Sequence, residues 1–157
     1  MKTSLIALLI AFLAHGAHSG HDIDITKPKK DKDAFVGTWL LDHVTLSTEN
    51  GEEEADVFSV GLIIYSADGY MSAVLTRSEN QKENPGMDVG YCGRYEVNEK
   101  ETYVRHMRDV ITINSENEEG VFVRDYEFSS DKNTLVLSPR ESNRQGMSLT
   151  WKRASVR

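Results

Sequence analysis

Apolar and polar residues alternate through most of the chain after Phe35, which is the pattern of half-buried β-strands. Turn-forming segments separate the runs, as at Ser66-Ala67-Asp68-Gly69 and Asn98-Glu99-Lys100-Glu101. No stretch keeps a helical period for more than about two turns. The pattern predicts eight strands: Val36–Leu46, Phe58–Tyr65, Tyr70–Arg77, Gly90–Val97, Thr102–Ile113, Gly120–Phe128, Thr134–Ser138 and Met147–Arg153.

The short connections make successive strands antiparallel neighbours, because a parallel return needs a crossover of about a dozen residues. We therefore predict an all-β fold, an eight-stranded antiparallel up-and-down barrel, since closure removes exposed strand edges. An interior of this size holds core side chains or one small ligand. Two connections are longer, the acidic Ser47–Val57 and Ser78–Val89; each is either a solvated loop or a cover over the barrel mouth.

The N-terminal residues have a different character. Lys2 precedes ten consecutive apolar residues, Leu5 to Ala14, and a small-residue pattern follows, which predicts a signal peptide over residues 1–19 and a secreted or periplasmic protein. The apolar run is shorter than the roughly 20 residues that span a bilayer, so no membrane integration is expected after cleavage. An uncleaved anchor or a buried helix is the alternative. Residues 20–34 are polar and predict a flexible arm, and residues 35–157 form the barrel domain.

Charge and composition narrow the function classes. The formal charge of −7 gives no basic surface for nucleic acid. Cys92 is the single cysteine, so no internal disulfide is expected; it is either a small buried residue or a reactive thiol. We expect no metal site, because the histidines near the N-terminus lie in the leader and the arm, and no cofactor, because no nucleotide or zinc motif is present. The oligomeric state stays open.

A family resemblance appears in a series of motifs. They are Phe35-Val36-Gly37-Thr38-Trp39, Gly61 to Ala73 with its Ser66-Ala67-Asp68-Gly69 turn, Gly93-Arg94-Tyr95-Glu96-Val97, and Arg124-Asp125-Tyr126-Glu127-Phe128. In order and spacing, this series resembles the lipocalin-like domain family, a compact barrel that often stands alone without an assigned function. The resemblance implies that Gly37 and Trp39 close one barrel end, with Arg153 lying across the Trp ring. Family members commonly carry two adjacent histidines in the fifth strand. Here Arg105 precedes His106, which puts in doubt any role that needs the pair.

Strand alternation predicts which side chains face the interior, although a β-bulge would reverse the assignment. If Trp39 faces inward, alternation along its strand also places His43 inside. Applied to the other strands, alternation places several polar side chains among apolar ones in the interior, which is the composition of small-molecule sites. The predicted ligand-binding residues are His43, Tyr91, Tyr95, His106, Arg108, Arg124 and Tyr126. For each arginine the alternative is outward exposure or an internal ion pair with a residue such as Asp109, Asp125 or Glu127.

Three functions follow from these residues. In the first, the exported barrel binds a small apolar molecule. In the second, it is a cofactor-independent isomerase or cyclase that acts on a flexible small-molecule substrate of secondary-metabolite type, with His106, Arg124 and Tyr95 as catalytic candidates. His106 suits proton transfer near neutral pH, although a structural histidine is the alternative. In the third, the barrel is an interaction module that docks through its acidic 49–56 loop.

Overall fold

The computed structural model describes residues 30–81, 88–113, 120–140 and 146–155. The elements are α1 (Asp31–Phe35), β1 (Gly37–Thr48), β2 (Gly51–Glu54), β3 (Phe58–Tyr65), β4 (Tyr70–Arg77), η1 (Glu79–Gln81), β5 (Val89–Asn98), β6 (Tyr103–Met107), β7 (Val110–Ile113), β8 (Val121–Phe128), β9 (Thr134–Pro139) and β10 (Met147–Arg153). The predicted signal peptide and residues 20–29 of the predicted arm lie outside the described residues. Within them, no helix has the length and apolar character needed to cross a membrane.

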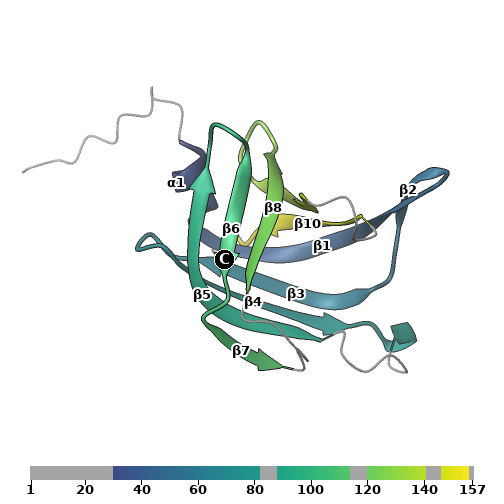
Figure 1. The fold of residues 1–157 in the computed structure, drawn as a ribbon. Helices are drawn as coiled ribbons and strands as arrows, with labels where there is room; N and C mark the ends of the chain where they lie inside the picture. Colours follow the sequence, from purple (N-terminus) through teal and green to yellow (C-terminus); the bar gives the residue numbers. More distant parts are fainter. Residues whose placement is uncertain (1–29, 82–87, 114–119, 141–145, 156–157) are drawn as a thin grey trace, which may run out of the picture.

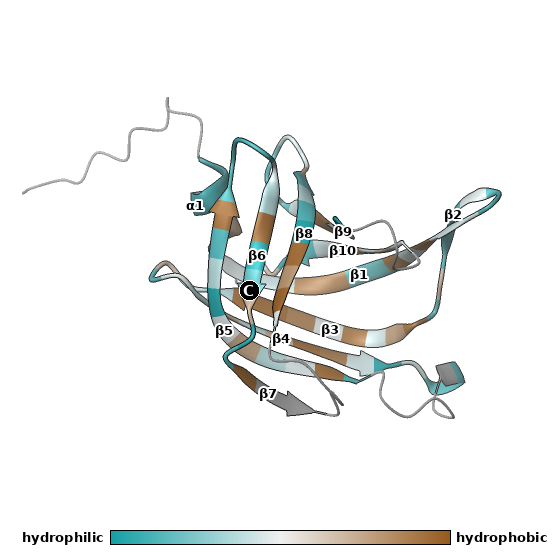
Figure 2. Cartoon of the chain, viewed as in Figure 1, coloured by the Kyte–Doolittle hydropathy of each residue, from teal (hydrophilic) through white to brown (hydrophobic). Residues whose placement is uncertain are grey.

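The strands form a closed eight-stranded antiparallel barrel, which confirms the predicted fold class (Figure 1). Each barrel strand pairs with the next along the chain, and β10 returns to pair with β1 from Trp39↔Arg153 to Leu46↔Met147. β6 and β7 are two parts of one barrel strand, since both pair with β5. Hydrophobic residues concentrate on the strands, whereas the β5–β6 turn and the start of α1 are hydrophilic (Figure 2).

The fifth predicted strand, Thr102–Ile113, is interrupted at Arg108 and Asp109. There the Asp109 amide donates to the carbonyl of Met107 at 3.1 Å, and the Asp109 carboxylate accepts from the Arg94 amide at 3.2 Å. The strand presses on β5 at this break, since a Cβ on Gly93 would lie 1.8 Å from the Met107 oxygen. The interruption therefore depends on a glycine in the neighbouring strand.

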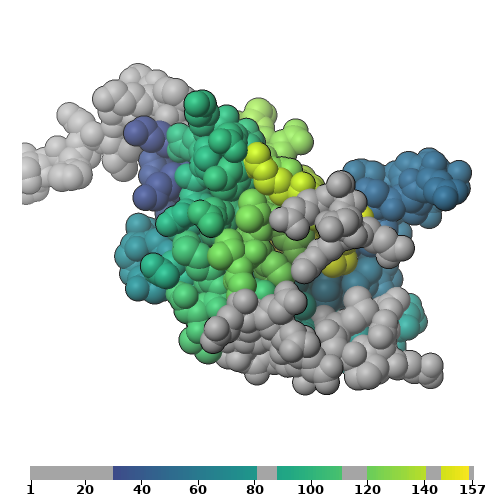
Figure 3. All heavy atoms as spheres, in the orientation of Figure 1, coloured from purple at the N-terminus to yellow at the C-terminus, as the bar shows by residue number. Residues whose placement is uncertain are grey.

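The first long connection is not entirely a loop. Gly51–Glu54 forms β2, which pairs with Thr45–Thr48 at the end of β1 and extends it into a hairpin beyond the barrel wall. Gly51 has a φ of +120°, which glycine adopts without strain, and its carbonyl accepts from the Thr48 hydroxyl at 2.8 Å. In the space-filling view the hairpin projects from the body of the molecule (Figure 3).

The helix α1 closes one end of the barrel. The prediction of a flexible arm over residues 20–34 is therefore wrong at residues 31–34, which belong to this helix. Phe35 is fully buried, with its ring edge-on to Tyr65 at 5.1 Å and to Tyr126 and Phe128 at 5.0 Å between centroids. The Asp31 carboxylate accepts from the Tyr126 hydroxyl at 3.1 Å and from Lys132 Nζ at 2.8 Å. Burial of one aromatic ring thus orders a segment that is otherwise polar.

The same end holds the predicted group of Gly37, Trp39 and Arg153. The Arg153 guanidinium lies 4.2 Å from the Trp39 ring centroid and donates to the carbonyls of Val36 and Ala34 at 2.9 and 2.6 Å. Trp39 Nε1 donates to the Phe35 carbonyl at 2.8 Å. Gly37 leaves room for the guanidinium, because a Cβ there would lie 2.7 Å from Arg153 Nη1. These contacts connect both ends of the domain to α1.

Candidate functional site

Strand register brings the polar residues predicted on β5, β6 and β8 to the inner face of the barrel. His106 on β6 pairs with Tyr95 on β5 and with Phe122 on β8, and paired residues point to the same side of a sheet. His106 is 1% exposed. Arg124 lies opposite the fully buried Val104 in the next row of the same face.

Two tyrosines hold the His106 ring from both sides. The Tyr65 hydroxyl lies 2.8 Å from Nε2, and the Tyr91 hydroxyl lies 2.9 Å from Nδ1. A neutral imidazole has one donor and one acceptor nitrogen, so one tyrosine donates to the ring and the other accepts from it. We call Tyr65, His106 and Tyr91 the histidine triad.

The surroundings keep the triad uncharged at neutral pH. Burial lowers the pKa of His106 from 6.5 to about 3, and the positive charge of Arg124 adds to the effect. Burial also raises the pKa of Tyr91 to about 12 and that of Tyr65 well above 10, an effect that Arg124 partly offsets. The triad is therefore a neutral hydrogen-bonding group, with two phenols that keep their protons.

Phe122 connects the triad to the two arginines. Its ring meets the Tyr91 ring edge-on at 5.7 Å. The Arg108 guanidinium lies 3.8 Å from the Phe122 centroid and that of Arg124 lies 5.3 Å from it. Arg108 Nε also donates to the Gly120 carbonyl at 3.3 Å. Phe122 and Arg124 are half-buried, so the inner face keeps some accessible surface beside the triad.

The hydroxyl groups of Tyr95 and Tyr126 lie away from the histidine triad. The Tyr95 hydroxyl donates to the Ser66 carbonyl in the β3–β4 turn at 2.9 Å, whereas Tyr126 reaches Asp31 in α1. Burial and the Asp31 carboxylate raise the pKa of Tyr126. Their rings surround Phe35, so both hydroxyls belong to the closed end rather than to the histidine triad.

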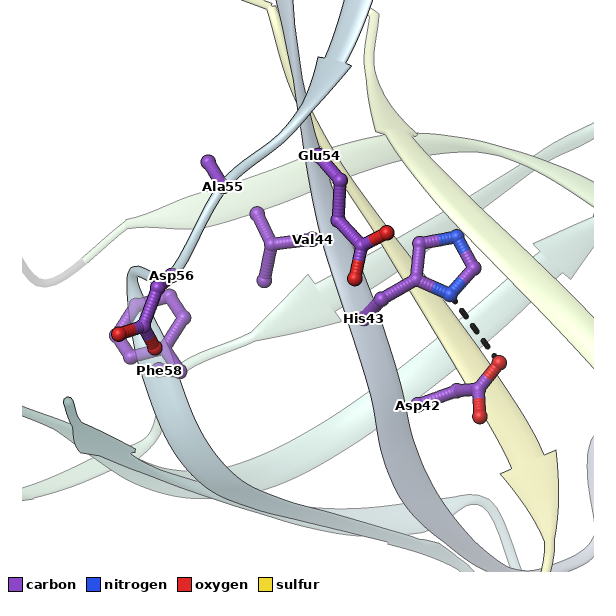
Figure 4. Close-up of a pocket in the computed structure, with 7 residues that line it drawn as sticks. All are labelled: Asp42, His43, Val44, Glu54, Ala55, Asp56 and Phe58. Atoms are coloured by element: carbon purple, nitrogen blue, oxygen red, sulfur yellow. Dashed lines mark hydrogen bonds and ion pairs between the residues drawn. The ribbon is translucent and has the colours of Figure 1, made fainter.

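His43 does not face the interior, and its predicted placement is wrong. The register between β1 and β10 shifts between Leu41 and His43, which turns the later residues of β1 to the opposite side. Val44 is the buried residue at 1% exposure, whereas the His43 side chain is 35% exposed. Its Nδ1 lies 3.1 Å from the Asp42 carboxylate, on the wall of a separate pocket (Figure 4).

The sequence prediction missed Tyr65, which holds one side of the triad. β3 carries apolar residues on both faces, for example Ile63 inside and Ile64 outside, so its alternation gives no direction. Met71 pairs with Tyr65 on one side and with Gly93 on the other, so these three residues face the same side of the sheet. This assignment needs the strand register, which the sequence does not give. Among the described residues, no group of three or more His, Cys, Asp and Glu side chains is placed to hold a metal ion.

Comparison with known proteins identifies the family of this chain. No curated protein matches the chain. The family model described as a lipocalin-like domain matches residues 36–154, which include every barrel strand and the histidine triad. By this match over most of its length, the chain belongs to the lipocalin-like domain family.

Proposed function

We propose that this barrel binds a small, largely apolar molecule on its inner face and that the histidine triad recognises a polar atom of that molecule. The supporting observation is the buried triad beside the half-buried Phe122 and Arg124. Small-molecule sites have mostly apolar walls with a few fixed polar groups. The inner face of this barrel has that composition, with Ile63, Ala73 and Trp39 in one cross-strand row with Tyr91.

The polar atom on the ligand is an oxygen that accepts hydrogen bonds. One phenol uses its proton in the hydrogen bond to His106, and the other accepts from the ring and keeps its O–H free to donate; burial raises the pKa of Tyr91 to about 12, so the phenol stays protonated. The positive charge of Arg124 acts on all three members of the triad. It lowers the pKa of His106 and partly offsets the increase in the pKa of Tyr65 and Tyr91 that burial causes. A carbonyl, hydroxyl or carboxylate oxygen suits this positive field, and the rest of the molecule would contact aromatic and aliphatic side chains.

The protonation states favour binding over the isomerase or cyclase alternative. A general acid or base works best when its pKa lies near the working pH. The pKa of His106 is about 3 and that of Tyr91 about 12, so neither exchanges a proton readily near neutrality. Tyr95, the third catalytic candidate, has a hydroxyl that donates to the Ser66 carbonyl and a pKa raised by burial.

Native mass spectrometry of the full protein from the cells that make it tests this function. We expect a retained molecule that survives purification and is lost on unfolding. The fluorescent probe 8-anilinonaphthalene-1-sulfonate, which has aromatic rings and acceptor oxygens, is expected to bind with saturation. Tyr91→Phe should weaken it about threefold to tenfold, the effect of one neutral hydrogen bond.

The matched control is Tyr70→Phe. Tyr70 is 55% exposed, so this substitution removes the same hydroxyl group from the outer surface of the barrel. Its affinity for the probe should equal that of the original protein. The proposal is overturned if no molecule is retained and the two tyrosine variants bind the probe alike.

We also propose that the protein is exported, with residues 1–19 removed. The support is the pattern of a basic residue, ten apolar residues and small residues at the N-terminus. N-terminal sequencing of the protein from its source should then begin at Gly20. A mature chain that keeps Met1 or the apolar run would contradict export by this route.

A further inference from the structure

The outer surface of the barrel is apolar on the wall formed by β1, β3, β4, β5 and β7 (Figure 1). Strand pairing arranges the outward residues of this wall in two adjacent rows. The first row runs through Leu40, Leu62, Val74 and Gly90. The second row runs through Thr38, Ile64, Ser72, Cys92 and Val110. We call these two rows the apolar face.

The apolar face exposes large aliphatic side chains and no charge. Four of its side chains are between 39% and 51% exposed: Leu40, Ile64, Val74 and Val110. Neither row contains a charged residue, although charged residues make up 27% of the chain. The outer surface of β5, β6 and β8 differs, since Arg105 pairs with Glu96 at 3.8 Å and Arg140 with Asp125 at 3.3 Å. A contiguous apolar area with a polar rim is typical of a surface that binds another protein.

The charges lie at the two margins of the apolar face, where its rows end. At the margin formed by β10 and β1, Lys152 Nζ lies 4.0 Å from the Asp42 carboxylate. At the margin formed by β5 and the start of β7, Arg94 Nε lies 3.5 Å from the Asp109 carboxylate. All four side chains are exposed. Each margin therefore offers one positive and one negative charge.

We propose that the apolar face binds a second copy of this chain and forms a symmetric dimer. Both copies contribute the same surface to such an interface. A two-fold axis that passes across the middle of the face brings each margin of one copy against the other margin of the second. Lys152 then lies toward Asp109 of the second copy, and Arg94 lies toward its Asp42.

This charge pattern favours a second copy over an acidic or a basic partner. A partner of one charge sign would meet a repelling charge at both margins, whereas a second copy supplies each margin with both signs. Burial of the two rows supplies the attraction, because aliphatic surface leaves water. The dimer uses the outer surface alone, so it does not depend on the function proposed for the inner face.

The size of the apolar face sets the expected strength of the dimer. Its five strands lie about 4.8 Å apart, and the two rows with their neighbours extend about 20 Å along the strands, so two copies would bury about 1,000 Å² in total. This area is at the lower end of specific protein interfaces. We therefore expect a weak dimer with a dissociation constant of about 10–100 µM.

Analytical ultracentrifugation of the protein purified from the cells that make it tests the dimer. Cys92 locates the interface in the same samples, because it is the single cysteine, is half-buried in one copy and lies in the second row. A second copy on the apolar face covers this thiol. Between about 1 µM and 0.5 mM protein, we expect a shift from monomer to dimer, with alkylation of Cys92 by iodoacetamide slowed about threefold or more.

Val74→Lys places a charge in the middle of the apolar face and should weaken the dimer about tenfold or more, because that charge has no partner in the interface. Alkylation of Cys92 should then stay fast at high protein concentration. Val136→Lys is the matched control, since Val136 pairs with the exposed Glu127 on β9, four strands away from β4. Circular dichroism confirms that both variants remain folded.

The proposal is overturned if the protein stays monomeric up to about 0.5 mM, well above the expected dissociation constant. It is also overturned if a dimer forms while Cys92 keeps its reactivity, or if Val136→Lys weakens the dimer as much as Val74→Lys, because the interface would then lie elsewhere. A monomer whose Cys92 is unreactive at every concentration would mean that something other than a second copy covers the face.

Discussion

At the scale of single residues, the histidine triad is a buried polar group whose members satisfy one another. Both nitrogens of His106 have a tyrosine partner within 2.9 Å, so the ring is held in one orientation. A buried polar atom without a partner costs more than a hydrogen bond contributes, because it has lost its water without replacement. The triad is therefore sensitive to the removal of any one hydroxyl.

Tyr65→Phe tests this sensitivity. The variant leaves His106 Nε2 buried without its partner and keeps the ring that packs on Phe35. We expect the free energy of unfolding to fall by about 1–3 kcal/mol, measured by urea denaturation. Tyr70→Phe on the outer surface should change it by less than about 0.5 kcal/mol. Equal values for the two variants would mean that the Tyr65 hydroxyl does not stabilise the fold.

Acid should destabilise the protein through His106. Its pKa is about 3 in the folded state and about 6.5 in the unfolded chain, so only the unfolded state takes up a proton between these values. The stabilisation from the neutral ring is complete above pH 6.5 and falls as the pH drops toward 3, by at most about 1.4 kcal/mol per pH unit.

Urea denaturation between pH 7.5 and pH 4.5 measures this loss, with His106→Gln as the comparison because glutamine keeps a donor and an acceptor without titrating. The original protein should lose stability more steeply than the variant as the pH falls. Parallel curves for the two proteins would show that His106 is not the group responsible.

At the scale of elements, one glycine decides where the fifth barrel strand breaks. Gly93 lets the Met107 carbonyl approach β5 at the point where β6 ends, and Arg94 fixes the break through its ion pair with Asp109 at 3.5 Å. Arg108 keeps the inward parity of Val104 and His106, since its amide still bonds the Gly120 carbonyl, and the break after it reverses the parity and leaves Val110 51% exposed. Strand parity thus places Arg108 against Phe122, and the interruption begins only after it.

Gly93→Ala should be strongly destabilising. The new Cβ would lie 1.8 Å from the Met107 oxygen, a backbone atom that can move only if β5 and β6 separate. We expect a loss of about 3 kcal/mol or more in thermal or urea unfolding. Cys92→Ala, one residue earlier on the same strand, creates no such clash. A Gly93→Ala protein as stable as the Cys92 variant would argue against close strand contact at this point.

At the scale of the whole molecule, stability is uneven between the barrel and its hairpin. Closure by β10 against β1 places Leu149 and Trp151 in the core, whereas every residue of β2 is exposed. Amides that open only on global unfolding exchange slowest, and those in exposed extensions exchange through local opening.

Hydrogen exchange measured by NMR should separate the two regions. We expect the β2 amides at Glu52 and Glu54 to exchange several orders of magnitude faster than those of Leu149 and Trp151 in β10. Equal protection of β2 and β10 would mean that the hairpin opens only when the barrel unfolds.

The local sequence determined the barrel, because alternation and turn chemistry act over a few neighbouring residues. β3, β4 and β10 begin and end at the predicted residues, and Tyr91, His106 and Arg108 face inward as predicted. It also predicted that Arg153 lies across Trp39. These features follow from strand parity and from the family motifs.

Tertiary structure alone decided the rest, because each remaining feature depends on residues far apart in the chain. The register shift against β10 turned His43 outward, and the approach of β6 to Gly93 produced the break in the fifth strand. Burial among barrel aromatics made a helix of Asp31–Phe35. Tyr65 became a partner of His106 across 41 positions of sequence, a contact that no local pattern encodes.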